Sequence, residues 1–304
     1  AITAAEVGFA GQSVKCPIAA AVPALATTCT GYGQAGSLVT SPVGYKHEIG
    51  FLTVPLKTQI ANHLARFGNF KDSDLVLVSI GFNEVFFHFE KEYLPAFFVS
   101  LQKKTDGLIT DDAFKAEVFQ AQTRAQEAMK TAALALADLV RTQILAKGGK
   151  YVAVTTLIDM TKTPEAMALP LPLPEPYLTA VRDAVKPMLD ILPQTFDLWL
   201  REGLTGQAVQ MLDARTVFDD MTKNPATYGF VDITSKACDA AKMPAASGGS
   251  SLFCNTTPGA PFNMLTTGAN TTTWLFADGV HPTTGGHKAF SDAFLKQLKA
   301  FGWI

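Results

Sequence analysis

Apolar positions in the first third of the chain predict a helix that leads directly into a strand. Residues 52–67 carry apolar side chains at intervals of three and four, the spacing of one face of an α-helix. The run 74–80 that follows is almost continuously apolar and ends at Gly81. Such a run is typical of a buried strand, so we expect both faces of 74–80 to be covered.

Helices and strands continue to alternate in the middle of the chain. A long helical pattern covers 111–147, beginning after a capping sequence and stopping at Gly148 and Gly149. A second apolar, β-branched run follows at once and predicts a strand over 151–157. A third strand is predicted at 207–213.

The rest of the pattern completes an α/β arrangement. Between the second and third strands we expect a helix over 177–203, interrupted near Pro193. Residues 222–275 are loop-rich, and the chain ends in an amphipathic helix over 284–301. Strand, helix, strand, helix and strand in this order predict a mostly parallel sheet covered by helices on both faces. No boundary divides 1–304, so a single domain is expected.

The composition is that of a globular protein and argues against several partners. Of the 304 residues, 48% are hydrophobic and 17% are charged, which is unlike a disordered chain. The formal net charge is −2, and the sequence contains no run of basic residues. We therefore expect the protein to bind neither nucleic acid nor an anionic membrane surface. No apolar stretch approaches the roughly 18 residues of a membrane span, so no transmembrane segment is expected.

The four cysteines form two local pairs, Cys16 with Cys29 and Cys238 with Cys254. Each pair brackets a short stretch rich in Pro, Ala, Ser or Gly, as a disulfide-closed loop does. The alternative is four reduced thiols in the cytosol. We expect two disulfides and hence a secreted or periplasmic protein. No Cys-x-x-Cys occurs and no histidine stands at metal-ligand spacing from a cysteine, so no metal site is expected.

The segment from Asp278 to Pro282 carries the most specific chemistry. An aspartate three residues before His281, held in a Gly/Pro turn, supplies two parts of a relay that activates a serine hydroxyl. The imidazole takes the proton of the hydroxyl, and the carboxylate fixes the tautomer of the imidazole. The alternative is an aspartate that caps the last helix beside a surface histidine.

Two other segments offer hydrogen-bond donors for a developing negative charge. Asn83 follows the predicted strand 74–80, and ligand sites in open α/β sheets lie at such strand ends. Its amide can donate to an oxyanion. The glycine-rich stretch 31–37 lets a backbone N–H approach a substrate closely. Taken singly, each segment also fits an ordinary tight turn.

Together, and in this order, the three segments resemble those of the SGNH/GDSL hydrolases, most closely the secreted bacterial GDSL esterases. The glycine block of the family matches the region of Gly36, its Gly-x-Asn-Asp block matches 81–84, and its Asp-x-x-His-Pro block matches 278–282. The likeness extends over most of the chain from about Cys16 and includes 29–32, 52–64 and 228–229.

The resemblance implies a three-layer α/β/α sandwich of the flavodoxin-like type and a serine esterase that needs no cofactor. His281 is then the general base, Asp278 orients it, and the oxyanion is bound by Asn83 and the Gly36 amide. The implied substrates are small-molecule or lipid-like carboxylic esters, with short acyl esters as the family-level expectation.

The chain departs from the family most in its nucleophile block. The family carries the serine in Gly-Asp-Ser-Leu after an apolar strand, whereas the nearest match here is 11–13, preceded by a poor strand that contains Glu6. Ser13 is therefore one candidate nucleophile. The alternative we favour is a serine on an N-terminal fragment of the same precursor that stays bound as a second chain. Smaller departures are Ala35 in place of a glycine and Glu84 in place of the second Asp.

Three other functions stay open at this point. One is a binding protein on the same fold that has lost its serine. Another is an esterase for carbohydrate O-acetyl groups or phospholipids. The third is a metal-dependent hydrolase, which needs ligands beyond Asp278, His281 and His287. The phenylalanines around His88, within 86–89, line an acyl pocket or, in the interpretation we prefer, pack in the core.

Overall fold

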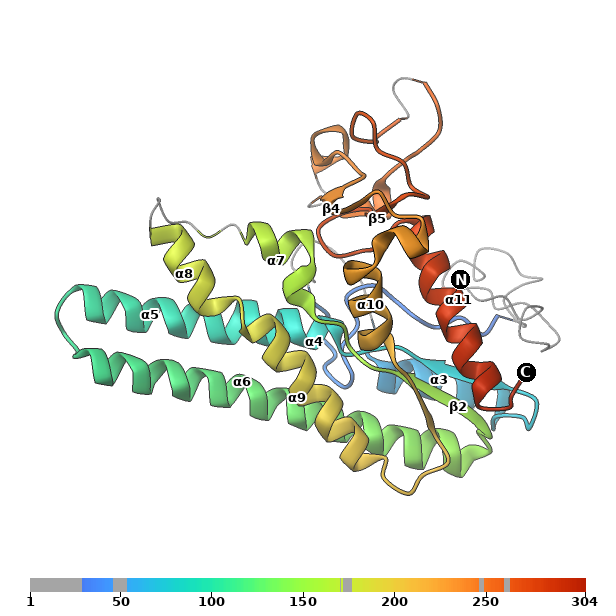
Figure 1. Cartoon of the computed structure of the whole chain (residues 1–304). Helices are drawn as coiled ribbons and strands as arrows, with labels where there is room; N and C mark the ends of the chain where they lie inside the picture. Colours follow the sequence, from blue (N-terminus) through green and yellow to red (C-terminus); the bar gives the residue numbers. More distant parts are fainter. Residues whose placement is uncertain (1–28, 46–53, 170, 172–176, 246–248, 260–262) are drawn as a thin grey trace. The chain divides into compact units, whose positions relative to one another are not determined.

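The computed structural model describes residues 29–45, 54–169, 171, 177–245, 249–259 and 263–304 (Figure 1). The chain forms two compact units that interleave along the sequence. In the described part, the large-sheet unit contains residues 29 to Leu157, Ile191–Leu212 and Phe301–Ile304. The C-terminal unit contains Ile158–Asp190 and Asp213–Ala300. That 1–304 forms a single domain stays a prediction.

The large-sheet unit is built on a parallel sheet of three strands in the order β1–β2–β3. The strands are β1 Leu75–Val78, β2 Tyr151–Thr155 and β3 Gln210–Leu212. Val78 pairs with Val154, which pairs with Met211, so the three carboxyl ends lie at one edge of the sheet. Each strand falls inside the segment predicted for it. The predicted α/β class with parallel strands is confirmed.

The prediction that 74–80 is buried on both faces is wrong. Leu77 is 47% exposed and Ser79 is also exposed, whereas Val78 and Ile80 are buried. The four residues of β2 from Val152 are buried, in contrast to those of β1. Among the described strands β1 has a neighbour only on its β2 side. An apolar run indicates a strand, but the neighbours that cover it are set by the tertiary structure.

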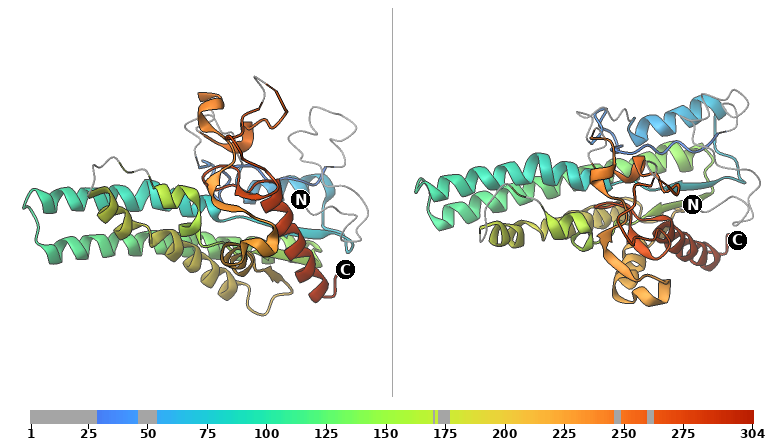
Figure 2. Two further views of the ribbon diagram at one scale, coloured as in Figure 1. Left: turned by 45° about the horizontal axis from the view of Figure 1, so that its top comes forward. Right: turned by 90° about the horizontal axis from the view of Figure 1, so that it is seen from above.

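Two long helical stretches of this unit lie side by side as an antiparallel hairpin (Figures 1 and 2). The first runs through α4 Phe82–Phe87, a π-helical segment His88–Tyr93 and α5 Leu94–Thr105. The second is α6 Asp111–Leu139, which continues helically to Lys147 and confirms the predicted helix over 111–147. Thr110 Oγ accepts from the N–H of Ala113 at its start, and Gly148 ends it with a φ of 93°.

A shorter helix of the same unit, α3 Leu56–Phe67, corresponds to the predicted helix over 52–67. It begins at Leu56 because Pro55 before it has an extended backbone, with a ψ of 159°. Residues 46–53 lie outside the described part of the chain. The helical pattern is thus confirmed over 56–67.

The predicted break near Pro193 is wrong in position. The stretch 177–203 divides into α8 Tyr177–Val185 and α9 Met188–Gly203, so the break falls at Lys186 and Pro187. Pro193 lies inside α9, where it removes one backbone hydrogen bond at a cost of about 3 kcal/mol. Burial of apolar side chains of α9 offsets that cost, and those fully buried are Leu192, Phe196 and Leu200.

The C-terminal unit holds the end of the chain. Its elements, besides α8, are α7 Pro164–Ala168, α10 Ala214–Lys223, β4 Asp232–Lys236, β5 Trp274–Phe276 and α11 Thr284–Ala300. The ring of Phe218 stacks on that of Phe290 at 6.3 Å, which joins α10 to α11, and it also meets Phe276 of β5 edge-on. The sequence pattern predicted that 222–275 is loop-rich and did not predict the parallel pair β4 and β5.

A disulfide joins Cys238 to Cys254, with the two Cα atoms 6.0 Å apart, as the cysteine spacing predicts. Cys29 is also disulfide-bonded, and Cys16 lies outside the described residues. Of the helices in the part of the chain that the structure describes, none is both long and apolar enough to cross a bilayer.

Candidate active site

Asp278 and His281 form a hydrogen-bonded pair in the loop after β5. His281 Nδ1 lies 2.8 Å from Oδ2 and 3.0 Å from Oδ1 of Asp278. The aspartate side chain is 5% exposed, whereas the imidazole is 58% exposed. When Nδ1–H donates to the carboxylate, Nε2 carries the lone pair, and no described residue bonds to it. The pair therefore presents a proton acceptor to solvent.

The carboxylate of Asp278 is held by backbone donors as well as by the imidazole. Its oxygens accept from the N–H groups of Ser251 at 2.7 Å, Val280 at 2.9 Å and His281 at 2.8 Å. Burial alone raises the pKa of Asp278, but the hydrogen bond and electrostatic attraction of the His281 ring, with the bonds from the N–H groups of His281 and Ser251, outweigh it and hold the pKa well below its usual range. The carboxylate thus stays charged beside the imidazole.

Backbone bonds close the Asp278 loop between β5 and α11. The N–H of Ala277 donates to the carbonyl of His281 at 2.8 Å, and the N–H of Thr283 donates to that of Leu275 at 2.9 Å. Thr283 Oγ accepts from the N–H of Gly286 in the first turn of α11. The cap of this helix is therefore Thr283, and Asp278 is left to bind His281.

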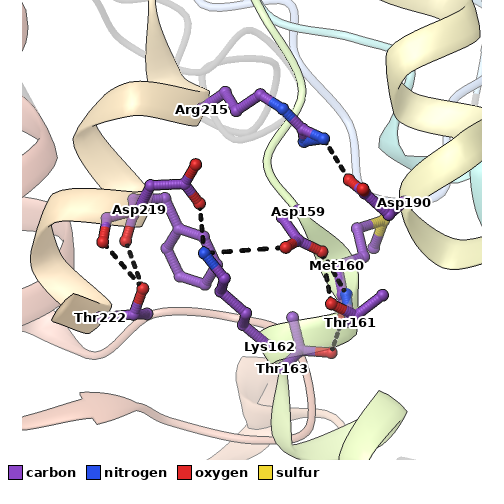
Figure 3. A network of polar contacts seen from close by, with 10 residues as sticks. Asp159, Met160, Thr161, Lys162, Thr163, Asp190, Arg215, Asp219 and Thr222 are labelled. Atoms are coloured by element: carbon purple, nitrogen blue, oxygen red, sulfur yellow. Dashed lines mark hydrogen bonds and ion pairs between the residues drawn. The ribbon is translucent and has the colours of Figure 1, made fainter. Parts of the chain in front are cut away.

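A polar network lies in the same unit around the segment 159–163 (Figure 3). Lys162 Nζ lies 2.6 Å from Asp219 of α10 and 3.7 Å from Asp159, and Arg215 pairs with Asp190. The network ties the segment 159–163 to α10, and Thr163 at its end caps α7. Within α7, the N–H of Glu165 donates to the carbonyl of Gly279 at 2.9 Å. A Cβ added at Gly279 would lie 3.1 Å from Cβ of Glu165, so α7 packs closely on the loop at this glycine.

Asn83 and the glycine loop meet in the large-sheet unit. Gly81, with a φ of 114°, turns the chain from the end of β1 into α4, and an added Cβ would lie 2.9 Å from the ring of Phe196. Asn83 Nδ2 then donates to the carbonyl of Ser37 at 3.0 Å. Because the amide has two hydrogens, one remains for a ligand.

Gly36 precedes this contact and has a φ of 78°, a conformation that favours glycine. Its carbonyl accepts from the N–H of Tyr45 at 2.8 Å, and no described residue accepts from its own N–H. The hydroxyl of Ser37 donates to the carbonyl of Val54 at 2.9 Å, so it serves the loop itself. Gly36 thus offers a backbone donor next to the residue that Asn83 binds.

The structure brings the predicted site residues together as two pairs. Asp278 and His281 belong to the C-terminal unit, and Gly36 and Asn83 belong to the large-sheet unit. Ser13 lies outside the described residues, so its assignment as nucleophile stays a prediction. Ser251 is a partner of Asp278 that the sequence does not reveal, because every residue type except proline supplies a backbone N–H and no motif marks this one.

Several aromatic and histidine side chains of the large-sheet unit, among them those around His88, pack against other rings or pair with a carboxylate. Phe89 is 1% exposed, which fits the core, and Phe86 stacks on Tyr45 at 5.6 Å. His88 lies 2.8 Å from Glu92, and His63 of α3 stacks on a phenylalanine ring. In the described part of the chain, no three His, Cys, Asp or Glu side chains gather as a metal site.

Glu84 is a buried carboxyl beside Asn83 that the sequence marked only as a departure from the family pattern. It is 3% exposed, Oε1 accepts from the N–H of Val39 at 2.5 Å, and Oε2 has no hydrogen-bond partner in the described structure. Burial raises the pKa of Glu84 to about 7, and the bond from Val39 opposes that rise without cancelling it. The folded protein therefore holds the protonated form more tightly than an unfolded chain does.

We expect Glu84→Gln to flatten the dependence of stability on pH. Because the pKa is about 7 in the folded state and 4.5 in the unfolded state, the wild type loses stability as pH rises from 4.5 through 7. That loss amounts to roughly 3 kcal/mol by pH 8, and glutamine, which never ionises, escapes it. Urea unfolding of both proteins at pH 5 and pH 8 measures the effect. Parallel losses in the two proteins would contradict it.

A family model described as GDSL-like Lipase/Acylhydrolase matches residues 44–294 of the chain. The matched range contains Asn83, Asp278 and His281, and it begins after Gly36. No curated protein matches the chain.

Proposed function

The chain belongs to the GDSL-like lipase/acylhydrolase family, and from that premise we propose that it is a serine esterase acting through His281 and Asp278. Membership of the family implies ester hydrolysis in general. The observation that carries the finer proposal is the exposed imidazole whose Nδ1 lies 2.8 Å from a buried, charged carboxylate. This geometry leaves Nε2 able to take a proton.

In the proposed reaction a serine Oγ attacks the ester carbonyl carbon while its proton passes to His281 Nε2. Asp278 stabilises the imidazolium that forms. Asn83 Nδ2 and the Gly36 N–H donate to the oxyanion, each contributing roughly 3 kcal/mol to the stabilisation of the transition state. The imidazolium then protonates the leaving alcohol, and water hydrolyses the acyl-enzyme by the same steps. The substrates are carboxylic esters with small-molecule or lipid-like groups.

The nucleophile we propose is a serine of the N-terminal region, either Ser13 or a serine on an N-terminal fragment of the same precursor bound as a second chain. We also place the protein in a secreted or periplasmic compartment. The disulfide between Cys238 and Cys254 supports that location, because disulfides persist in oxidising compartments.

Labelling with a fluorophosphonate probe, followed by mass spectrometry of the intact sample and its peptides, tests this proposal. We expect one adduct per molecule, on Ser13 or on a co-purifying peptide, because the probe reacts with activated serines. His281→Ala is the matched control and should abolish the adduct. If the folded protein takes no label under any condition, the esterase proposal is wrong, and a binding protein on the same fold becomes the better interpretation.

A further inference from the structure

We propose that the short helical turn Ser251–Phe253 binds the hydrocarbon part of the ester substrate through Leu252 and Phe253. The inference rests on the proposed function, since it names the part of the substrate that lies beside His281. The turn belongs to the C-terminal unit, as His281 does.

The turn and the imidazole of His281 bind the same carboxylate oxygen. Asp278 Oδ2 accepts from the backbone N–H of Ser251 at 2.7 Å and from His281 Nδ1 at 2.8 Å. Leu252 follows Ser251 directly in the chain. An ester whose carbonyl lies at His281 therefore has Leu252 and Phe253 within reach of its attached chain.

The two side chains of the turn are exposed although they are large and apolar. Leu252 is 65% exposed and Phe253 is 46% exposed. Solvent-exposed apolar pairs of this kind favour contact with an apolar ligand, because the contact removes both surfaces from water. The stretch 249–259 around them contains no charged residue, so it offers an uncharged chain an apolar surface and offers a charged headgroup no partner.

The turn is also held in place before any ligand arrives. Within it, the N–H of Cys254 donates to the carbonyl of Ser251 at 2.9 Å. Cys254 is disulfide-bonded to Cys238, and the N–H of Cys238 donates to the carbonyl of Ala277, next to Asp278. The turn is thus tied to the Asp278 loop at two points. A surface fixed in advance loses little entropy when it binds a ligand.

The test compares the double variant L252S/F253S with the wild type on p-nitrophenyl acetate and p-nitrophenyl octanoate. We expect kcat/KM for the octanoate to fall roughly tenfold or more, mainly through KM, with that for the acetate within about twofold of wild type. Val231→Ser is the matched control, because Val231 is an apolar residue of the same unit that is 78% exposed and lies outside both the turn and the Asp278 loop. An equal fall for both esters, or no fall for either, overturns the inference.

Equilibrium binding separates this inference from the proposed function. N-methyl octanamide carries the same chain on an amide in place of the ester, and calorimetry measures its affinity without any reaction. Weaker binding to L252S/F253S than to the wild type supports the inference even if the wild type hydrolyses no ester. Absence of ester hydrolysis would contradict the proposed function but not this inference. Equal binding overturns it. So does a variant that loses only binding to phosphatidylcholine vesicles, because the turn would then dock on a lipid surface.

Discussion

Replacing His281 with alanine is expected to lower kcat for p-nitrophenyl butyrate about 10⁴-fold while leaving the thermal unfolding midpoint almost unchanged. The substitution removes the proposed general base. It leaves the fold intact because the imidazole is 58% exposed and Asp278 keeps three backbone donors, those of Ser251, Val280 and His281 itself. Steady-state kinetics and calorimetry on the same preparation measure both quantities.

The matched control for this prediction is His287→Ala. His287 is an exposed histidine of α11 in the same unit, six residues further along the chain. We expect its replacement to change kcat less than twofold, since it lies outside the proposed relay. Equal losses in the two variants would contradict the assignment of His281 as the base and would revive a site that uses both histidines.

Elements with strong local signals were predicted almost completely. The helix over 111–147 is an example, because Thr110 supplies the cap, two glycines supply the stop, and both act within a few residues. The contact between Asp278 and His281 could be predicted equally well, since three residues of separation in a tight turn bring His281 to the carboxylate. Signals of this kind act over short distances in the sequence, so their effect does not depend on the tertiary structure.

Features set by the tertiary structure could not be predicted in this way. The exposure of Leu77 depends on which strands lie beside β1, and the burial of Glu84 depends on residues near Val39, 45 positions away in the chain. The strand β4 was missed because its sequence is polar and its pairing with β5 joins residues about 40 positions apart. In each case the decisive partner is remote in sequence.

The second large effect is expected from Asn83→Ala, which should lower kcat about 10² to 10³-fold while changing KM less than about threefold. In our proposal the Asn83 amide donates one hydrogen to the carbonyl of Ser37 and the other to the oxyanion, whose charge develops only in the transition state. The lost bond to Ser37 costs about 1 kcal/mol of stability, which urea unfolding measures separately.

Glu84→Gln is the matched control, since it alters the adjacent side chain and keeps an acceptor for the N–H of Val39. We expect its kcat at pH 5 to stay within about twofold of wild type, where the glutamate is protonated and glutamine resembles it most. A role for Asn83 that is only structural predicts a different pattern, in which KM rises and kcat falls in proportion to the stability lost. The division of the effect between kcat and KM therefore decides whether Asn83 donates to the reacting group or only holds the loop at Ser37.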